Sequence, residues 1–284
     1  MFSPLFWYVV TTLLWGAYWG LLCLVLCLTR VRQAPRRLGA AALVCVWQAC
    51  ALVSLPWFYW AGLLGFEPPI TWVSPLYHVV DWTGQVVSLL VSGVVVYGLK
   101  WVTPAEVGLT GLQPRSWRLV GPVVAAVATA VLLNAYFTRQ SSPTLWWNER
   151  VFYTTLPGLA EEVFYRGVLL GLLGRVFARR LPLLGTQTSW GGVVGVILFA
   201  LAHDLKFPSS LLASLQIGNV HSLLKLKEWY YWFSLWHVSP GRQLYYLAMG
   251  TLFLWVRERS GSCWAAVGAH CLMNTCLTIG ASVG

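Results

Sequence analysis

The chain contains about eight apolar runs, each roughly long enough to cross a lipid bilayer as one helix. They fall near residues 5–28, 38–64, 84–101, 119–137, 151–173, 189–206, 243–257 and 262–283. About 20 apolar residues are needed to cross roughly 30 Å of hydrocarbon as an α-helix. Only 10% of the residues are charged, against roughly 25% in soluble domains, so this composition cannot build a water-facing surface. The sequence therefore predicts an all-α, multi-pass bundle of transmembrane helices.

The basic residues are distributed unevenly between the two sides that these spans define. Of the 19 Lys and Arg residues, 12 lie in one alternating set of connections: Arg30, Arg32, Arg36, Arg37, Lys100, Arg115, Arg118, Arg175, Arg179, Arg180, Arg257 and Arg259. The opposite set of connections carries six basic residues, and Arg166 lies inside a span. Basic connections stay on the cytoplasmic side, so both ends of the chain are expected outside. The net charge of +10 thus indicates topology and contact with anionic lipid head groups rather than nucleic acid.

The chain is expected to divide into N-terminal transmembrane helices at 1–140 and a C-terminal core at 141–284. Within the core, residues 207–242 combine Leu-rich stretches with lysines and the aromatic run WYYWF. This composition is typical of a helix lying in the membrane interface, with its rings at head-group depth. Such a segment serves either as a passive interfacial belt or as a platform for substrate.

Charged residues interrupt the fifth apolar run. A charge inside a span costs at least about 2.5–3.5 kcal/mol on insertion scales, so it is rarely placed there without a use. Glu162 and Arg166 are four residues apart, which puts them on one helix face as a charge pair. Glu161 projects about 100° away from Glu162 and cannot share that guanidinium equally.

Two later apolar runs each carry a histidine that is four residues away from a second motif residue. Phe199 and His203 lie in the sixth run, and His270 and Asn274 lie in the last. Each pair therefore shares a helix face. Three helices with one polar face each, in spans that need none, predict that these faces converge on one cavity between the late helices.

The chemistry available to these groups is hydrolysis by an activated water. A carboxylate with an imidazole can deprotonate water, and a second histidine with an amide can donate hydrogen bonds to a developing oxyanion. No cofactor is expected, and the HExxH motif of zinc proteases is absent. Glu161, His203 and His270 could still bind zinc from separate helices, which keeps a metal site as an alternative. A proton-coupled transporter and a non-catalytic scaffold or immunity protein are the other readings, since carboxylate–histidine chains also relay protons.

The three motifs Glu161-Glu162-x-x-x-Arg166, Phe199-x-x-x-His203 and His270-x-x-x-Asn274 resemble, in order, those of the CPBP group. This group comprises the CAAX-protease and bacteriocin-processing enzymes, which are related to type II CAAX prenyl endopeptidases. The resemblance covers roughly residues 145–280. The segment AEVGLTGLQPRSW also resembles the sequence that often precedes this core.

The resemblance implies an all-helical intramembrane endopeptidase in the bacterial inner membrane. Its substrate would be a membrane-associated protein or a peptide processed at its C-terminus. Carried over residue by residue, Glu161 is the general base and His203 is its partner on the water. His270 and Asn274 form the oxyanion site, and Glu162 with Arg166 orients the first helix of the site.

Overall fold

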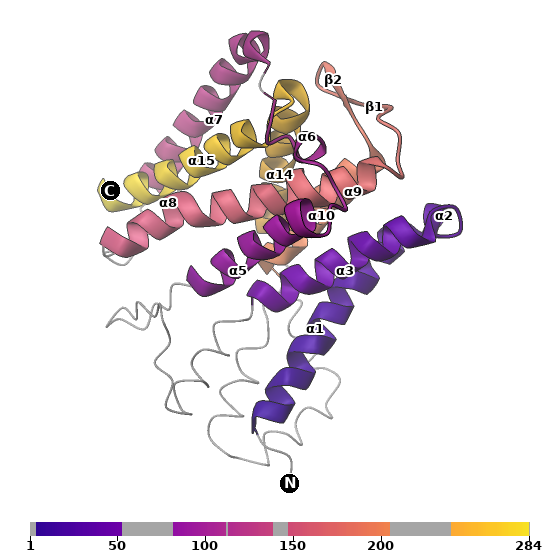
Figure 1. Ribbon diagram of the computed structural model, residues 1–284. Helices are drawn as coiled ribbons and strands as arrows, with labels where there is room; N and C mark the ends of the chain where they lie inside the picture. The colour runs from indigo at the N-terminus through magenta and orange to yellow at the C-terminus, as the bar shows by residue number, and fades with distance from the viewer. Residues whose placement is uncertain (1–3, 53–81, 112, 139–146, 205–239, 284) are drawn as a thin grey trace.

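The computed structural model describes residues 4–52, 82–111, 113–138, 147–204 and 240–283 (Figure 1). Most of these residues are helical. The helices are α1 (Pro4–Leu26), α2 (Leu28–Val31), α3 (Pro35–Leu52), α5 (Trp82–Gly93) with the π-helical turn η1 (Val94–Gly98), α6 (Pro104–Val107), the 3-10 turn η2 (Pro114–Ser116) with α7 (Trp117–Phe137), α8 (Trp147–Glu162), the π-helical segment η3 (Val163–Leu169), α9 (Leu170–Gly174), α10 (Trp190–Asp204), α14 (Pro240–Ser260) and α15 (Cys263–Val283).

The predicted apolar runs correspond to helices wherever the structure describes them. The fifth run is one uninterrupted helical rod made of α8, η3 and α9. Within the described residues, only the helix at Pro114–Phe137 is both long and apolar enough to cross a membrane, by length and composition. The number of eight spans therefore stays a prediction. The interfacial segment expected at 207–242 lies outside the described residues up to position 239, and residues 240–242 begin α14.

The expectation of an all-α chain is wrong at one place. Two short strands, β1 (Leu181–Leu183) and β2 (Thr186–Thr188), pair antiparallel, with Leu183 opposite Thr186. The two residues between them, Leu184 and Gly185, have φ of 43° and 78°. Positive φ at both central residues is the geometry that matches the twist of a two-residue hairpin. This hairpin is hard to predict from the sequence, because a leucine rarely occupies the first of these positions.

The helices pack around one core of buried side chains that includes residues from α1 to α15. α1 packs along α3, α15 packs on both α7 and α8, and α10 packs on α14 (Figure 1). Large hydrophobic side chains are also exposed on several of these helices, among them Leu14, Leu21, Leu90, Phe137 and Leu244. Exposed apolar side chains on so many helices are expected where the helices contact lipid.

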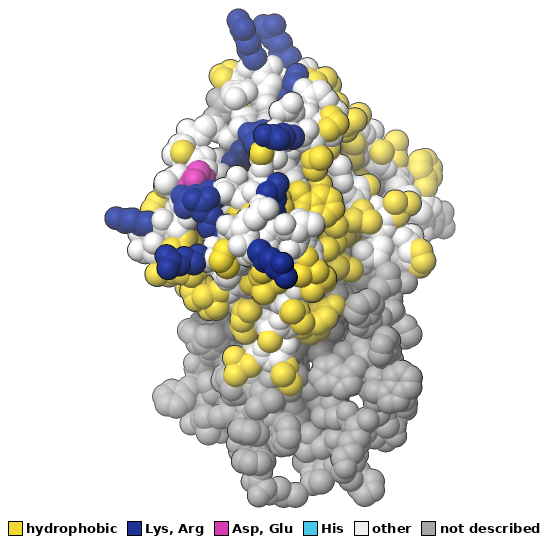
Figure 2. All heavy atoms as spheres, turned by 90° about the vertical axis from the view of Figure 1, so that its right-hand side faces the viewer, with side chains coloured by type: hydrophobic (Ala, Val, Ile, Leu, Met, Phe, Trp, Pro, Cys, Tyr) yellow, Lys and Arg dark blue, Asp and Glu magenta, His cyan; other side chains and the backbone are white. Residues whose placement is uncertain are grey.

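The basic residues that were assigned to one side lie at 30–37, 100–118, 175–180 and 257–259, and these four segments meet at one end of the bundle. Arg37 donates to the carbonyl oxygen of Arg175 at 2.7 Å, and Arg175 forms an ion pair with Glu106 at 2.7 Å. Arg179, which precedes the hairpin, pairs with Glu258 near the end of α14 at 2.6 Å. Lys and Arg side chains accordingly gather over this end of the molecule, with apolar side chains beside and below them (Figure 2). The connections share one side, as the charge asymmetry predicts, and that side is expected to face the cytoplasm.

Cysteine labelling from outside intact cells tests this orientation. A cysteine replacing Gln33, which is exposed in the basic connection before α3, should not react with a membrane-impermeant maleimide. A cysteine replacing Ser142 should react, because it lies in a connection of the opposite set. The parent protein, with only its native cysteines, supplies the background signal. Labelling at position 33 but not at 142 would reverse the predicted topology.

Candidate active site

The two adjacent glutamates at the end of α8 have different neighbours. The carboxylate of Glu161 faces α10, where its Oε2 lies 3.7 Å from Nε2 of His203. Both side chains retain some exposure, 15% for Glu161 and 23% for His203. This Oε2 is itself buried and has no hydrogen-bond partner among the described residues. A separation of 3.7 Å is too long for a direct hydrogen bond, and polar atoms at such a distance are commonly bridged by water.

The imidazole of His203 is held from two directions. Its Nδ1 lies 2.8 Å from the carbonyl oxygen of Phe199, one helical turn earlier. A carbonyl oxygen only accepts, so Nδ1 carries a hydrogen, and the nitrogen that faces Glu161 is Nε2. The ring of Tyr246, from α14, stacks on His203 with centroids 4.0 Å apart and an interplanar angle of 27°.

Glu162 is fully buried, and its carboxylate contacts two side chains, the guanidinium of Arg166 and the imidazole of His270. Its Oε1 lies 3.1 Å from Nη1 of Arg166 and 2.8 Å from Nδ1 of His270, while its Oε2 has no partner among the described residues. The predicted pair of Glu162 and Arg166 is therefore confirmed. Its contact with His270 was not predicted, and it places the third motif directly on the first. Gly158 allows this contact, because a Cβ there would lie 2.9 Å from Sγ of Cys271 and would push α8 away from α15.

The buried guanidinium of Arg166 has partners beyond Glu162. Its Nη2 donates to the carbonyl oxygen of Gly250 at 2.9 Å, and its Cζ lies 4.3 Å from the ring centroid of Phe199. A charge buried in this way is tolerated when an opposite charge and further hydrogen bonds replace its hydration. The aromatic face adds a cation–π attraction.

Phe199 is the centre on which the three motifs meet. Its ring centroid lies 4.5 Å from that of His203 and 6.0 Å from that of His270. The two histidines are therefore on the same side of the bundle, as the converging faces predict. The side chain of Asn274 is half-buried and makes no hydrogen bond to another described residue. A single water-filled cavity shared by Glu161, His203, His270 and Asn274 stays a prediction.

One face of α14 belongs to this site, and sequence reasoning missed it. Tyr246 stacks on His203, the carbonyl of Gly250 receives Arg166, and Phe253 stacks on His270 at 4.5 Å with an interplanar angle of 11°. Arg257 continues the same face and donates from Nε to the carbonyl oxygen of Arg166 at 3.2 Å. These four residues of α14 are spaced four, three and four positions apart, which places them on one helix face. The spacing alone did not indicate a site, because aromatic residues and glycine at helical spacing are ordinary in apolar helices.

Two glycine pairs pack differently from one another. Gly191 and Gly195 lie against the rod made of η3 and α9, as a helix-packing motif predicts. Gly167 and Gly171 lie instead against the connection between η1 and η2, which contains α6. A Cβ on Gly167 would come within 2.7 Å of Val107 in this connection. This connection therefore covers the outer face of η3.

The described residues do not gather three His, Cys, Asp or Glu side chains in a geometry that could hold a metal ion. Glu161 and His203 lie close together, and Glu162 contacts Nδ1 of His270 but not its Nε2. A zinc site built from Glu161, His203 and His270 therefore stays an alternative, because a metal-binding histidine often contacts a carboxylate through its other ring nitrogen.

Comparison with known proteins agrees with this geometry. A model of the family described as "Type II CAAX prenyl endopeptidase Rce1-like" matches residues 141–276, a range that contains all six predicted site residues. The family that this model describes is one of membrane-embedded peptidases, so the match supports a peptidase at this coarse level. Residues 141–276, just under half of the chain, are thus similar to the Rce1-like type II CAAX prenyl endopeptidases, and the match agrees with the family predicted from the three motifs. Searches of curated proteins and of solved structures found no match.

Proposed function

We propose that the protein is an intramembrane endopeptidase in which Glu161 and His203 activate a water molecule for peptide-bond hydrolysis. The observation that supports this most directly is the spacing of the two groups. Their facing atoms are 3.7 Å apart, and Oε2 of Glu161 has no hydrogen-bond partner among the described residues. A water between them can donate one hydrogen to the carboxylate and the other to the imidazole. The attacking oxygen lone pair then remains free.

In the first chemical step, the carboxylate of Glu161 takes a proton from this water while the oxygen of the water attacks the scissile carbonyl carbon. The carbonyl π-bond opens and its electron pair becomes the oxyanion of a tetrahedral intermediate. When the intermediate collapses, the C–N bond breaks and the departing nitrogen receives the proton held by Glu161. The products are a carboxylic acid and an amine, and Glu161 is again ionised. General base and acid catalysis by one positioned group typically contributes about 10²–10⁴ in rate.

His270 and Asn274 are the proposed donors to the oxyanion. Because Nδ1 of His270 donates to Glu162, Nε2 can donate as well only when the ring carries both hydrogens. Glu162 therefore contacts two groups of the site, Arg166 and His270. The amide of Asn274 supplies a neutral second donor.

The proposed substrate is a membrane-associated protein or a peptide cleaved near its C-terminus. The proposed setting is a multi-pass protein of the bacterial inner membrane with its basic end toward the cytoplasm. The exposed apolar side chains on several helices support contact with lipid. No cofactor takes part in the proposed reaction.

Mass spectrometry of membrane-protein termini tests this function. Cells carrying the wild-type chain should contain new protein termini that are absent from cells carrying Glu161→Gln at equal expression. Identical termini in both strains would contradict a protease and favour the scaffold or transporter readings. In membranes, cleavage of a substrate found in this way should continue after a chelator is added. Loss on chelation that zinc restores would favour the metal alternative.

A further inference from the structure

The turn that follows Glu161 and Glu162 is unusual. Residues Val163–Leu169 form the π-helical segment η3, in which each hydrogen bond spans five residues instead of four. Such segments are rare and occur mostly as single turns inside α-helices, often at functional sites. The direction in which α8 presents its two glutamates depends on how this turn is held.

Arg257 holds η3 from inside the protein. Its side chain is only 7% exposed, and its Nε donates to the carbonyl oxygen of Arg166 in the middle of η3 at 3.2 Å. Its Nη2 donates at 3.0 Å to the carbonyl oxygen of Glu106, near the C-terminus of α6. Carbonyls at a helix end lack intrahelical partners, so they are strong acceptors for a cation. One guanidinium thus joins η3 to the connection that covers it.

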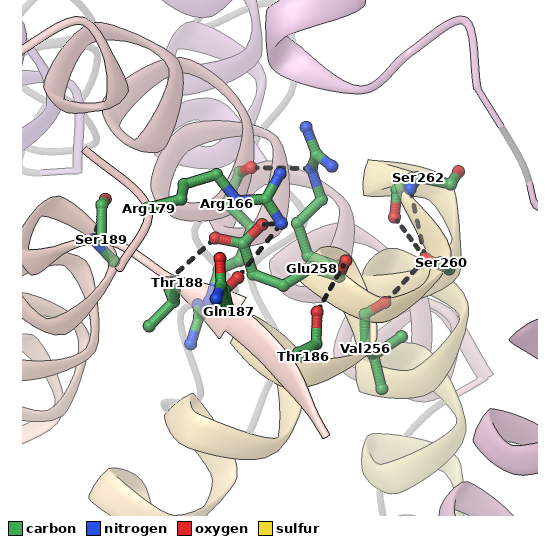
Figure 3. Close-up of polar contacts among 12 residues, drawn as sticks. Arg166, Arg179, Thr186, Gln187, Thr188, Ser189, Val256, Glu258, Ser260 and Ser262 are labelled. Atoms are coloured by element: carbon green, nitrogen blue, oxygen red, sulfur yellow. Dashed lines mark hydrogen bonds and ion pairs between the residues drawn. The ribbon is translucent and has the colours of Figure 1, made fainter. Parts of the chain in front are cut away.

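No carboxylate among the described residues forms an ion pair with Arg257. The adjacent acid, Glu258, turns to the other side of α14, where it pairs with Arg179 and accepts a hydrogen bond from Thr188 at 2.9 Å (Figure 3). The positive charge of Arg257 is therefore compensated by carbonyl dipoles. A planar group with donors in fixed directions suits this task better than a lysine ammonium.

The covering connection is shaped around this guanidinium. Gly108 has φ of +80°, and a Cβ added there would lie 2.5 Å from Cζ of Arg257. Only glycine adopts this backbone conformation readily and also leaves room for the guanidinium. The amide of Cys263, the first residue of α15, donates to the carbonyl of Gly108 at 2.9 Å. The connection is thus attached to the start of α15 as well as to η3.

The same connection is also anchored from outside. Arg175 contacts both carboxylate oxygens of Glu106, at 2.7 Å each, and holds the pKa of Glu106 down at about 2. The Glu106 side chain also closes a capping box with Thr103 at the start of α6. These exposed contacts fix the outside of α6, while Arg257 fixes its inside against η3.

We propose that Arg257 is a positioning residue of the active site. By joining the carbonyls of Arg166 and Glu106, it sets the turn that directs Glu161 toward His203 and Glu162 toward His270. It touches no reacting atom. A displacement of about 1 Å in a catalytic group can cost roughly 10²-fold in rate, so loss of this hold should lower turnover.

Arg257→Gln, Arg257→Lys and Arg259→Gln test the proposal in the full-length protein. Arg259 is a matched control because it lies on the same helix and donates to a single carbonyl, that of Gly185 in the hairpin. Amide hydrogen exchange of peptides covering residues 163–171 should rise about fivefold or more in Arg257→Gln, because a π-turn that loses its hold opens more often. Arg257→Lys keeps the charge and should give an intermediate rise, and Arg259→Gln should leave these peptides unchanged.

Kinetics on a substrate of the proposed protease give the second measurement. The kcat of Arg257→Gln per folded molecule should fall about 10–100-fold with KM within about twofold, as expected when positioning rather than binding is lost. Unchanged exchange in both Arg257 variants would overturn the proposal, as would faster exchange with unchanged kcat. The kinetic arm rests on the proposed function, whereas the exchange arm does not. A wild-type protein without cleavage activity would therefore defeat the protease proposal and leave exchange to decide the role of Arg257.

Discussion

Glu161→Gln is expected to abolish cleavage while leaving the protein folded and inserted. The amide keeps the shape of the side chain but cannot accept the proton of the water. Removing the general base should lower kcat by about 10²–10⁴-fold. Folding should be little affected, because Glu161 lies 3.7 Å from His203 and makes no hydrogen bond through Oε2 to a described residue. The measurements are monodisperse yield in detergent and turnover of a reporter substrate.

His203→Gln provides a comparison for this variant. Its amide can occupy the space of the imidazole but does not place an acceptor where Nε2 lies, so the water is less well oriented and kcat should again fall while yield is retained. Near wild-type turnover in Glu161→Gln, together with a well-folded but inactive Glu162→Gln protein, would mean that the roles of the two glutamates are exchanged.

Glu162→Gln and Arg166→Ala are expected to lower the folded yield along with activity. Each change leaves one member of a fully buried pair without its opposite charge. Removing one partner of a buried ion pair typically costs about 3–5 kcal/mol, a large part of the stability of a domain. Yield and thermal unfolding of the detergent-solubilised variants measure this cost.

The double variant Glu162→Gln/Arg166→Met separates charge imbalance from loss of packing. Removing both charges together should recover part of the yield that either single change loses, because no unpaired charge remains. Its activity should stay low, since the carboxylate that pairs with His270 is absent. Normal yield of Arg166→Ala would contradict the view that this pair is needed for folding.

Local spacing carried most of what the sequence could predict about the site. The pair of Glu162 and Arg166 is visible four residues apart on any helix, and so is the contact between Phe199 and His203. The bond between Glu162 and His270 joins positions 108 residues apart, so it depends on how α8 and α15 pack. The close approach at Gly158 that permits it has no signature in a chain that contains 26 glycines.

The contribution of α14 was hidden for a different reason. Stacking rings and a backbone carbonyl act through position rather than through chemically distinctive side chains, so Tyr246, Gly250 and Phe253 read as ordinary residues of an apolar helix. Arg257 was counted among the basic residues of a connection, yet it is buried against η3. A basic residue at the end of an apolar run satisfies the topology rule and structural needs equally well.

The pairing of Glu162 with Arg166 within a single helix matters for biosynthesis. Both residues enter the membrane during synthesis long before Gly250 and His270, their partners from α14 and α15, have been made. Because the two charges are one turn apart, they can neutralise each other as soon as the helix forms. The nascent rod can therefore leave the translocation channel without waiting for its neighbours. The proposed oxyanion donors are complete only after residue 274 has been synthesised, so under the proposed function the chain gains activity only once its last helix has been made.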